Sequence, residues 1–188
     1  MIVIVQGPPA SGKSTFARTV SARFGLPHIS RDLIQEWLSV VDTENDTRIQ
    51  KFCSHAGYEL MFKLAGELSK GAGGFVVEGC MNPETGPGRM KAALSPGHHR
   101  IVEVFLFASH EILVQRYLDR AGSETRHGAH GDESTRGEEL AQHLKAVTYT
   151  PMRIGDLVLE VDNGDDIEGT TDQLIKELEA FSRLPCTR

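Results

Sequence analysis

The chain has 188 residues, of which 39% are hydrophobic and 24% are charged, and its formal net charge is −6. These values are typical of one soluble globular domain over residues 1–188 and exclude a disordered chain. The acidic balance argues against a broad nucleic-acid surface, which is usually basic. The N-terminal residues lack the basic flank of a signal peptide, no apolar run reaches membrane-spanning length, and three scattered cysteines suit reduced thiols rather than disulfides or zinc. We therefore expect a cytoplasmic protein with no membrane association.

Strand and helix patterns alternate along the chain. In order, we expect a strand at 2–5, a helix at 13–24, a strand at 28–30, a helix at 32–41, a long helix at 46–70, a strand at 75–79, a short helix at 89–94, a strand at 100–108, helices at 110–121 and 137–149, a strand at 157–162 and a helix at 170–181. This alternation predicts an α/β fold with a parallel sheet covered on both faces.

The long helix is predicted from an apolar stripe at helical spacing. The stripe consists of Ile49, Phe52, Cys53, Ala56, Leu60, Leu64 and Leu68. Trp37 and Tyr58 have rings that could stack on a substrate, but both lie in helical stripes, so we expect them to pack in the core.

The stretch GPPASGKST matches the phosphate-binding pattern G-x-x-x-x-G-K-[ST] at residues 7–14. Glycine at both ends of the loop lets backbone N–H groups approach phosphate oxygens, and the following helix adds the positive end of its dipole. Lys13 is expected to reach the β- and γ-phosphates, and Ser14 to bind Mg²⁺. A chance match is disfavoured because a strand precedes the loop and a helix follows it. We expect ATP to contact Gly7, Pro8, Pro9, Ala10, Ser11, Gly12, Lys13, Ser14 and Thr15.

Asp32 follows the second expected strand, at the edge of a parallel sheet where ligands bind. A carboxylate there suits a general base that takes the proton of an attacking hydroxyl group. Arg31 beside it suits an anionic group of the substrate. The alternative is that Ser30 and Asp32 only cap the next helix, although capping and catalysis are compatible. A hydrolytic switch or motor usually needs a Walker-B aspartate and residues that position water, so transfer to a substrate is favoured.

Three arginines, Arg116, Arg120 and Arg126, precede or lie in a polar, glycine-containing segment without an apolar stripe. Arg116 and Arg120 are four residues apart and share one helix face. Guanidinium groups that close over ATP neutralise charge on the transferred phosphoryl group, so we expect a mobile lid at approximately residues 121–137. The alternative is a solvated helix face paired with Asp119 and Glu124.

Four segments, GPPASGKSTFAR, HISRDLI, FVVEGCMNPETGPGR and RYLDRAGSETRHGAHGD, occur in this order over roughly residues 1–132. They resemble the P-loop kinase family that includes polynucleotide kinases, chloramphenicol phosphotransferase and many small kinases of unassigned substrate. The resemblance implies a three-layer α/β/α P-loop NTPase fold of the nucleoside-kinase-like type. Its five-stranded parallel sheet would have the P-loop strand in the centre and a lid above it.

The resemblance also implies roles for single residues. Asp32 matches the catalytic base, and Arg31, Glu78 and Arg89 fall in the substrate site, with Glu78 also a candidate ligand of Mg²⁺ through water. Polynucleotide kinases usually carry Asp-Thr-Asn where this chain has Glu-Gly-Cys at 78–80, which bears on the substrate rather than on kinase chemistry. The catalytic set would be Lys13, Asp32, Arg116, Arg120 and Arg126, with Arg116 also on the nucleotide. Asn82 and Pro83 fit the loop after the third strand, and Asp162 and Asn163 the loop on the adenine side.

Histidines raise two further possibilities. His127 and His130 belong to the R-H-x-x-H element of the lid; their spacing would suit a metal, but no third ligand lies near them in the sequence. A segment without acidic residues contains Arg89, Lys91, His98, His99 and Arg100. A solvated loop is slightly favoured for it over a site for a phosphate or a nucleic-acid end.

The leading functional hypothesis is an ATP-dependent kinase that transfers the γ-phosphoryl group to a hydroxyl of a small molecule, as a monomer or homodimer. A polynucleotide 5′-hydroxyl kinase is favoured by the Ser-Arg-Asp element and the basic segment, and is opposed by the acidic net charge. A toxin-like kinase of a nucleotide sugar and a non-catalytic ATP-dependent regulatory module stay open. The regulatory module would not need Asp32.

Overall fold

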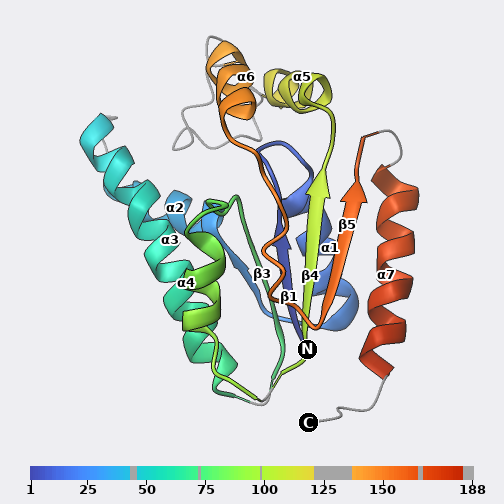
Figure 1. Ribbon diagram of the computed structural model, residues 1–188. Helices are drawn as coiled ribbons and strands as arrows, with labels where there is room; N and C mark the ends of the chain where they lie inside the picture. Colours follow the sequence, from blue (N-terminus) through green and yellow to red (C-terminus); the bar gives the residue numbers. More distant parts are fainter. Residues whose placement is uncertain (43–45, 72, 98, 121–136, 165–166, 184–188) are drawn as a thin grey trace.

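Five parallel strands form one sheet in the computed structural model, which describes residues 1–42, 46–71, 73–97, 99–120, 137–164 and 167–183 (Figure 1). The strand order is β2-β3-β1-β4-β5, with β1 (Ile2–Gln6) in the centre. The other strands are β2 (His28–Ser30), β3 (Phe75–Gly79), β4 (Ile101–Phe107) and β5 (Leu157–Asp162). The expected five-stranded parallel sheet with the P-loop strand in the centre is confirmed.

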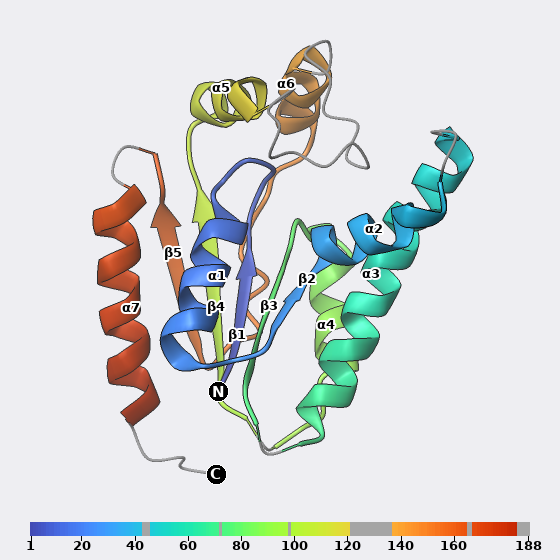
Figure 2. The same cartoon turned by 180° about the vertical axis from the view of Figure 1, so that it is seen from behind.

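Helices cover both faces of the sheet and make three layers. On one face lie α2 (Arg31–Leu38), α3 (Thr47–Ser69) and α4 (Gly86–Ala93), and on the other lie α1 (Lys13–Phe24) and α7 (Ile167–Arg183) (Figures 1 and 2). Strand β1 is buried along its whole length because its side chains alternate between two apolar clusters. Ile2 and Ile4 pack toward α3 and α4, whereas Val3 and Val5 pack toward α1 and α7.

Two more helices, α5 (His110–Arg120) and α6 (Gly137–Ala146), lie beyond the carboxyl ends of the strands (Figure 1). The chain then returns along the sheet to β5. Glu103, fully buried on β4, holds this returning segment: its Oε1 accepts hydrogen bonds from Gln6 Nε2 at 2.9 Å and from the Met152 N–H, and its Oε2 accepts one from the Ile154 N–H at 3.0 Å. The buried carboxylate is therefore satisfied by donors from two parts of the chain, strand β1 and the returning segment.

Apart from Cys53, the apolar stripe that predicts α3 does not lie on the face that the helix buries. Phe52, Leu60, Leu64 and Leu68 are 67%, 38%, 44% and 41% exposed. The buried face consists of Cys53, Gly57, Met61, Phe62, Ala65, Gly66 and Ser69. Its glycines decide the orientation, because a Cβ atom at Gly66 would lie 2.9 Å from the Ala93 carbonyl oxygen and one at Gly57 would lie 3.3 Å from that of Arg31. The close packing of α2 and α4 against these glycines therefore decides which face of α3 is buried, although the opposite face carries larger apolar side chains.

Other differences from the sequence expectations are local. Trp37 is 68% exposed, so its expected place in the core is wrong. The second helix ends at Leu38 and continues as one 3₁₀ turn, η1 (Ser39–Val41). Helix α4 begins three residues earlier than expected, because Asn82 Oδ1 accepts hydrogen bonds from the N–H groups of residues 84 and 85 and Pro87 occupies the first turn. Within the described residues, no helix combines the length and apolarity needed to cross a membrane.

Candidate active site

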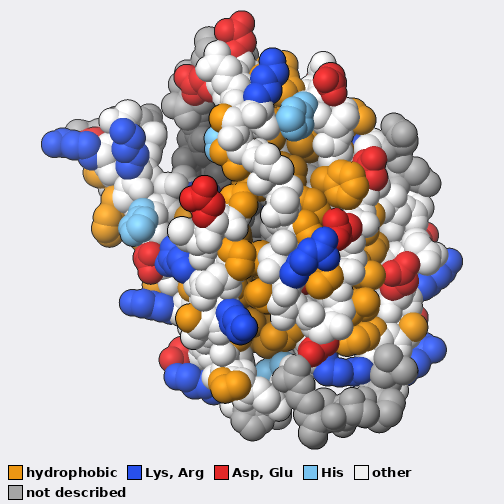
Figure 3. All heavy atoms as spheres, viewed as in Figure 1, with side chains coloured by type: hydrophobic (Ala, Val, Ile, Leu, Met, Phe, Trp, Pro, Cys, Tyr) orange, Lys and Arg blue, Asp and Glu red, His pale blue; other side chains and the backbone are white. Residues whose placement is uncertain are grey.

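A cleft of about 1090 Å³ opens at the carboxyl ends of the strands. The P-loop, α2, α3, α4 and the residues after β3 line one part, and α5, α6 and the segment after α6 line the other. Figure 3 shows the projecting end of α3 on the left and the helices α5 and α6 at the top, on the two sides of this region. Clefts of up to about 1000 Å³ commonly hold a drug-sized ligand, so this one has room for a nucleotide and a second small molecule.

The P-loop has the backbone shape that its glycines predict. Gly12 caps α1 in the left-handed region at φ 91°, and Gly7 has φ 147°, where a Cβ atom would collide with the Leu106 carbonyl oxygen. Lys13 is buried, and its Nζ donates to the Pro8 carbonyl oxygen at 2.6 Å across the loop. The loop residues that line the cleft are Pro9, Ala10, Gly12, Lys13, Ser14 and Thr15, whereas Gly7, Pro8 and Ser11 support them from outside the lining.

Asn163, after the last strand, braces the P-loop from below. Its Nδ2 donates to the Ser11 carbonyl oxygen at 2.9 Å, and its N–H donates to the Phe107 carbonyl oxygen at 2.7 Å. The side chain is almost fully buried. A Cβ atom at Gly12 would lie 2.5 Å from the same Nδ2, so the glycine leaves the space that Asn163 occupies. Asp162 caps the turn through its Oδ1 and does not line the cleft.

Glu78 is the second-last residue of β3 and is 2% exposed. The Ser30 hydroxyl donates to its Oε1 at 2.5 Å while accepting from the Leu33 N–H as the N-cap of α2. Burial raises the pKa of Glu78, and Asp32 adds to the rise; hydrogen bonds from Ser30 and Ser14 and the charge of Lys13 oppose it. Glu78 thus lies among Lys13, Ser14, Ser30 and Asp32.

His28 lies on the other side of Glu78, with its Nε2 4.0 Å from Oε1. Burial lowers the pKa of His28, and the charge of Arg18 lowers it further. Both effects disfavour the positively charged imidazole beside Glu78.

The oxygens of Ser14 and Glu78 fit a hard cation. Mg²⁺ prefers oxygen ligands and keeps several waters, so a hydroxyl and one carboxylate beside a phosphate cradle suffice for it. Among the described residues there is no group of three or more His, Cys, Asp or Glu side chains that would hold a metal without a nucleotide. His127 and His130 lie outside the described residues.

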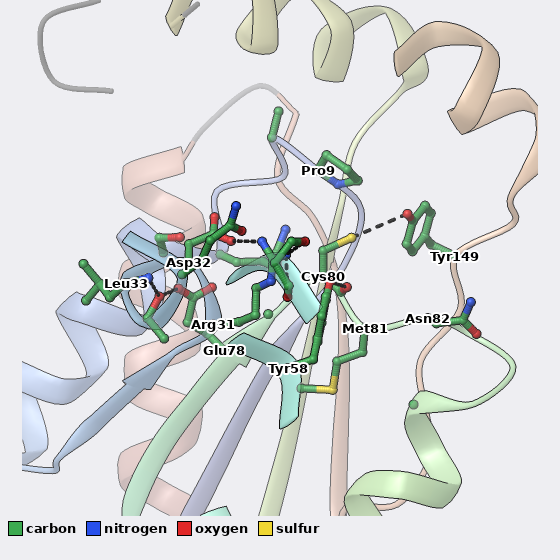
Figure 4. Close-up of a pocket in the computed structure, with 18 of the residues that line it drawn as sticks. Pro9, Arg31, Asp32, Leu33, Tyr58, Glu78, Cys80, Met81, Asn82 and Tyr149 are labelled. Atoms are coloured by element: carbon green, nitrogen blue, oxygen red, sulfur yellow. Dashed lines mark hydrogen bonds and ion pairs between the residues drawn. The ribbon is translucent and has the colours of Figure 1, made fainter. Parts of the chain in front are cut away.

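Arg31 and Asp32 lie together on the first turn of α2 and face the cleft (Figure 4). The Arg31 guanidinium lies 3.0 Å from Asp32 Oδ1, donates to the backbone and hydroxyl oxygens of Ser54, and stacks 4.5 Å from the centre of the Tyr58 ring. These contacts fix the guanidinium between α2 and α3. Ser30 is thus the cap of α2, and Asp32 is left on the cleft side of the turn.

A second arginine faces the cleft from α4. The Arg89 guanidinium stacks 4.4 Å from the centre of the Phe62 ring and lies 2.6 Å from Glu59 Oε1. Because Ser54, Tyr58 and Phe62 are four residues apart, they form one row along α3. Arg31 and Arg89 therefore approach the same wall of the cleft from two neighbouring helices.

Tyr149 and His143 line the cleft and are not found by sequence reasoning, which singles out only their neighbour Cys80, within the Glu-Gly-Cys stretch. The Tyr149 hydroxyl lies 2.7 Å from His143 Nε2 and 3.5 Å from Cys80 Sγ, and Figure 4 shows Tyr149 and Cys80 pointing toward one another. The Tyr58 hydroxyl donates to the Cys80 carbonyl oxygen, so Tyr58 is part of the cleft wall rather than only of the core. Burial raises the pKa of Tyr58 and of Tyr149. No motif or spacing links these residues, because they meet only through the fold.

Arg116 and Arg120 both line the cleft from α5. Arg116 Nη2 donates to the Gly164 carbonyl oxygen at 2.8 Å, and its Nη1 is buried without a hydrogen-bond partner among the described residues. The Arg120 guanidinium lies 5.5 Å from the centre of the Tyr117 ring. Arg126 and, except for Gly137 at the start of α6, the expected lid at approximately 121–137 lie outside the described residues.

The expected basic segment at 89–100 does not form one patch. Arg89 faces the cleft, whereas His99 is buried and its ring lies 2.7 Å from the Gly71 carbonyl oxygen. Arg100 stacks on Phe181 and donates to the Ser182 carbonyl oxygen. Residues 99 and 100 precede β4 at the opposite end of the sheet, so the idea of a common phosphate or nucleic-acid site is wrong; His98 lies outside the described residues.

A phosphate-binding loop at the end of the central strand, with strand order β2-β3-β1-β4-β5, defines a nucleotide-binding protein with the P-loop kinase fold. Residues 3–140 match the family described as an AAA domain, and the chain belongs to that family. Among solved structures, a putative kinase from Chloroflexus aurantiacus J-10-fl has a TM-score of 0.80 at 18% identity, over 95% of this chain and 97% of that one. A sugar kinase from Janibacter sp. HTCC2649 has a TM-score of 0.63 at 15% identity, over 94% and 93%.

Curated relatives match shorter stretches. A cytidylate kinase of Methylobacterium sp. (strain 4-46) is 33% identical over 69 residues, which are 36% of this chain and 33% of the relative. A cytidylate kinase of Methylocella silvestris is 53% identical over 34 residues, or 18% and 16% of the two chains. The chain thus spans a third or less of the length of these relatives. Membership of polynucleotide kinases or chloramphenicol phosphotransferase is not among these findings.

Proposed function

We propose that this protein is an ATP-dependent phosphotransferase that moves the γ-phosphoryl group of ATP to a hydroxyl of a small molecule. The supporting observation is that Asp32 faces the same cleft as the P-loop, with Glu78 close to Lys13, Ser14 and Asp32. A donor site and a carboxylate base therefore share one cleft. A non-catalytic regulatory module would bind ATP at the P-loop without needing the Asp32 carboxylate in the same cleft.

In the proposed reaction, the oxygen of the acceptor hydroxyl bonds to the γ-phosphorus, and Asp32 accepts the proton of that hydroxyl. The bond from that phosphorus to the β,γ-bridging oxygen breaks, ADP leaves, and the proton passes from Asp32 to water. Lys13 leaves the Pro8 carbonyl and pairs with the phosphates, and Arg116, Arg120 and Arg126 neutralise charge on the moving group. Ser14 and Glu78 would hold Mg²⁺, which when bound supplies further positive charge at the β- and γ-phosphates.

A second candidate is transfer to a phosphate oxygen of a nucleoside monophosphate. The short matches to two cytidylate kinases favour it, and so do the two guanidinium groups of Arg31 and Arg89 in the acceptor half of the cleft. An ionised phosphate carries no proton that a base must remove. The role of Asp32 therefore separates the two candidates.

An acceptor screen with labelled ATP tests the proposal. It should contain sugars, nucleosides, hydroxylated antibiotics, nucleotide sugars, 5′-hydroxyl oligonucleotides and cytidylate. Label on a small hydroxyl compound is the expected result. Label on cytidylate alone would replace the first candidate by the second, and label on oligonucleotides alone would revive the polynucleotide kinase.

Asp32→Asn then tests the base. With a hydroxyl acceptor we expect kcat to fall by about 10²–10⁴-fold while the KM for ATP changes little. Glu36→Gln is the matched control, since it removes the same charge one turn further along α2 from another residue of the cleft wall. Equal activity of Asp32→Asn and wild type would show that Asp32 is not the base.

A further inference from the structure

Seven large apolar side chains are conspicuously exposed on α2, η1 and α3. They are Trp37, Val40, Val41, Phe52, Leu60, Leu64 and Leu68, with exposed fractions from 38% to 75%. Among the described residues, only Leu118 is a comparably exposed large apolar side chain elsewhere. Scattered apolar residues are ordinary on a surface, but a concentration on three consecutive elements marks an interaction surface.

Four of these residues lie in one row along α3. Phe52, Leu60, Leu64 and Leu68 are separated by multiples of four, with Ala56 filling the remaining position. An i±4n row is the ridge that packs between the equivalent ridges of a second helix, at a crossing angle of about −50°. Figures 1 and 2 show α3 as the outermost helix on its side of the sheet, with its first turns projecting beyond the body.

We propose that this face of α3, the α3 ridge, is the interface of a homodimer in which the α3 helices of two copies pack antiparallel. A two-fold interface must be complementary to itself, because each residue meets its counterpart's neighbours. The ridge meets this condition. A single row of leucines flanked by phenylalanine packs against a copy of itself without burying a charge.

The flanking charges support a second copy as the occupant. The row next to the ridge runs Lys51, His55, Glu59, Lys63 and Glu67, and the last three of these side chains alternate in charge. With a two-fold axis near residue 61, Lys63 lies opposite Glu59 of the second copy, and Glu67 lies opposite His55. Glu59 also pairs with Arg89 of its own chain, so Lys63 would add a second cation to that carboxylate. The net charge of −6 per chain opposes association, but this row is locally balanced.

The size of the surface also suits a dimer. A stable interface covers about 800 Å² on each partner and has an apolar centre with a polar rim. The α3 ridge runs over 17 residues of a 23-residue helix, and Trp37, Val40 and Val41 are also exposed on the preceding α2 and η1. The interface would lie outside the row of Ser54, Tyr58 and Phe62 that faces the cleft, so both clefts stay open.

Sedimentation velocity of the full chain tests the proposal. We expect a species of twice the 20.6 kDa of one chain, and a monomer for Leu64→Glu, which places a charge in the middle of the ridge. Lys63→Glu, a substitution at an exposed position, should weaken the dimer by at least about tenfold, or 1.4 kcal/mol. Lys176→Glu makes the same charge change on an exposed position of α7 and should leave the dimer intact.

Far-UV circular dichroism and thermal unfolding would establish that each variant is folded. If Leu64→Glu does not fold, the proposal is tested by comparing Lys63→Glu, which should weaken the dimer, with Lys176→Glu, which should not. A wild-type chain that sediments as a monomer up to its solubility limit overturns the proposal. So does a dimer that folded Leu64→Glu and Lys63→Glu both leave unchanged.

Discussion

Glu78 should make the stability of the protein depend on pH. Burial holds the pKa of its carboxyl above the ordinary 4.5, so the native state keeps a proton that the unfolded state releases. The free energy of unfolding therefore falls as pH rises from about 4.5 through the raised native pKa. Glu78→Gln keeps an acceptor for Ser30 and cannot ionise, so it should lose this fall and gain stability relative to wild type toward pH 8.

Urea unfolding of the wild type and Glu78→Gln from pH 4.5 to 8 measures the difference. Glu160→Gln, at an exposed position on β5, is the control and should follow the wild type. Excess Mg²⁺ with an ATP analogue should also raise the free energy of unfolding. In the wild type this increase should become larger as pH rises, because the cation favours the ionised carboxylate of Glu78. In Glu78→Gln the increase should not depend on pH in this way. Parallel curves for wild type and Glu78→Gln would contradict the assigned burial effect.

Single residues differ in how well the sequence predicts their place. Gly7, Gly12, Lys13 and Ser14 could be assigned because their pattern encodes a local backbone shape, which the structure confirms. Asp32 and Glu78 could be placed at the site because Asp32 closely follows β2 and Glu78 lies near the end of β3, at the carboxyl edge of a parallel sheet. Tyr149 could not be found, since it lies just before the segment that Glu103, far away in the sequence, holds against the sheet. His143 could not be found either, since it reaches the cleft on α6, whose place over the sheet no local pattern encodes.

At the scale of elements, the loop after β5 should control the shape of the P-loop. Asn163→Ala removes the hydrogen bond to the Ser11 carbonyl and leaves that buried oxygen unpaired. We expect the free energy of unfolding to fall by about 1–3 kcal/mol and the affinity for an ATP analogue to fall with it. Chemical unfolding and calorimetric titration measure the two effects.

Asn163→Asp makes this test more specific. It keeps the shape of the side chain but places a carboxylate oxygen, which cannot donate a hydrogen bond, against the Ser11 carbonyl oxygen. The free energy of unfolding should fall at least as much as in Asn163→Ala. An aspartate variant that binds nucleotide as the wild type does would mean that the brace has no influence on the loop.

Helix α3 shows why element faces are harder to predict than element positions. Its helical spacing correctly predicts a helix near residues 46–70, since both faces of α3 carry apolar side chains at helical intervals. Which face is buried depends on Gly57 and Gly66, because they allow α2 and α4 to approach α3 closely. Periodicity depends on the size and polarity of side chains. It therefore does not detect a glycine that favours burial because it lacks a side chain.

At the scale of the whole molecule, nucleotide binding should stabilise the fold. An ATP analogue with Mg²⁺ at about 100 times its Kd adds about 2.7 kcal/mol to the free energy of unfolding. For a chain of this size that corresponds to a rise in Tm of roughly 5–10 °C. Thermal unfolding with and without the analogue measures it.

Lys13→Ala should abolish most of this rise, because its ammonium group is the expected partner of the β- and γ-phosphates. Lys176→Ala on α7 is the matched control and should keep the full rise. An equal rise in Lys13→Ala would place the nucleotide elsewhere.

The hydrogen bond between Asn163 and Ser11 also bears on how the protein is made. The two residues are 152 positions apart, and β1 pairs with β3 and β4, at Phe75 and Ile101. At a synthesis rate of roughly 5–20 residues per second, the P-loop waits on the order of ten seconds after its own synthesis for the side chain that braces it. During that interval the apolar strand β1 has few of its native neighbours, and a nascent chain in this state depends on the ribosome environment or a chaperone to stay unaggregated.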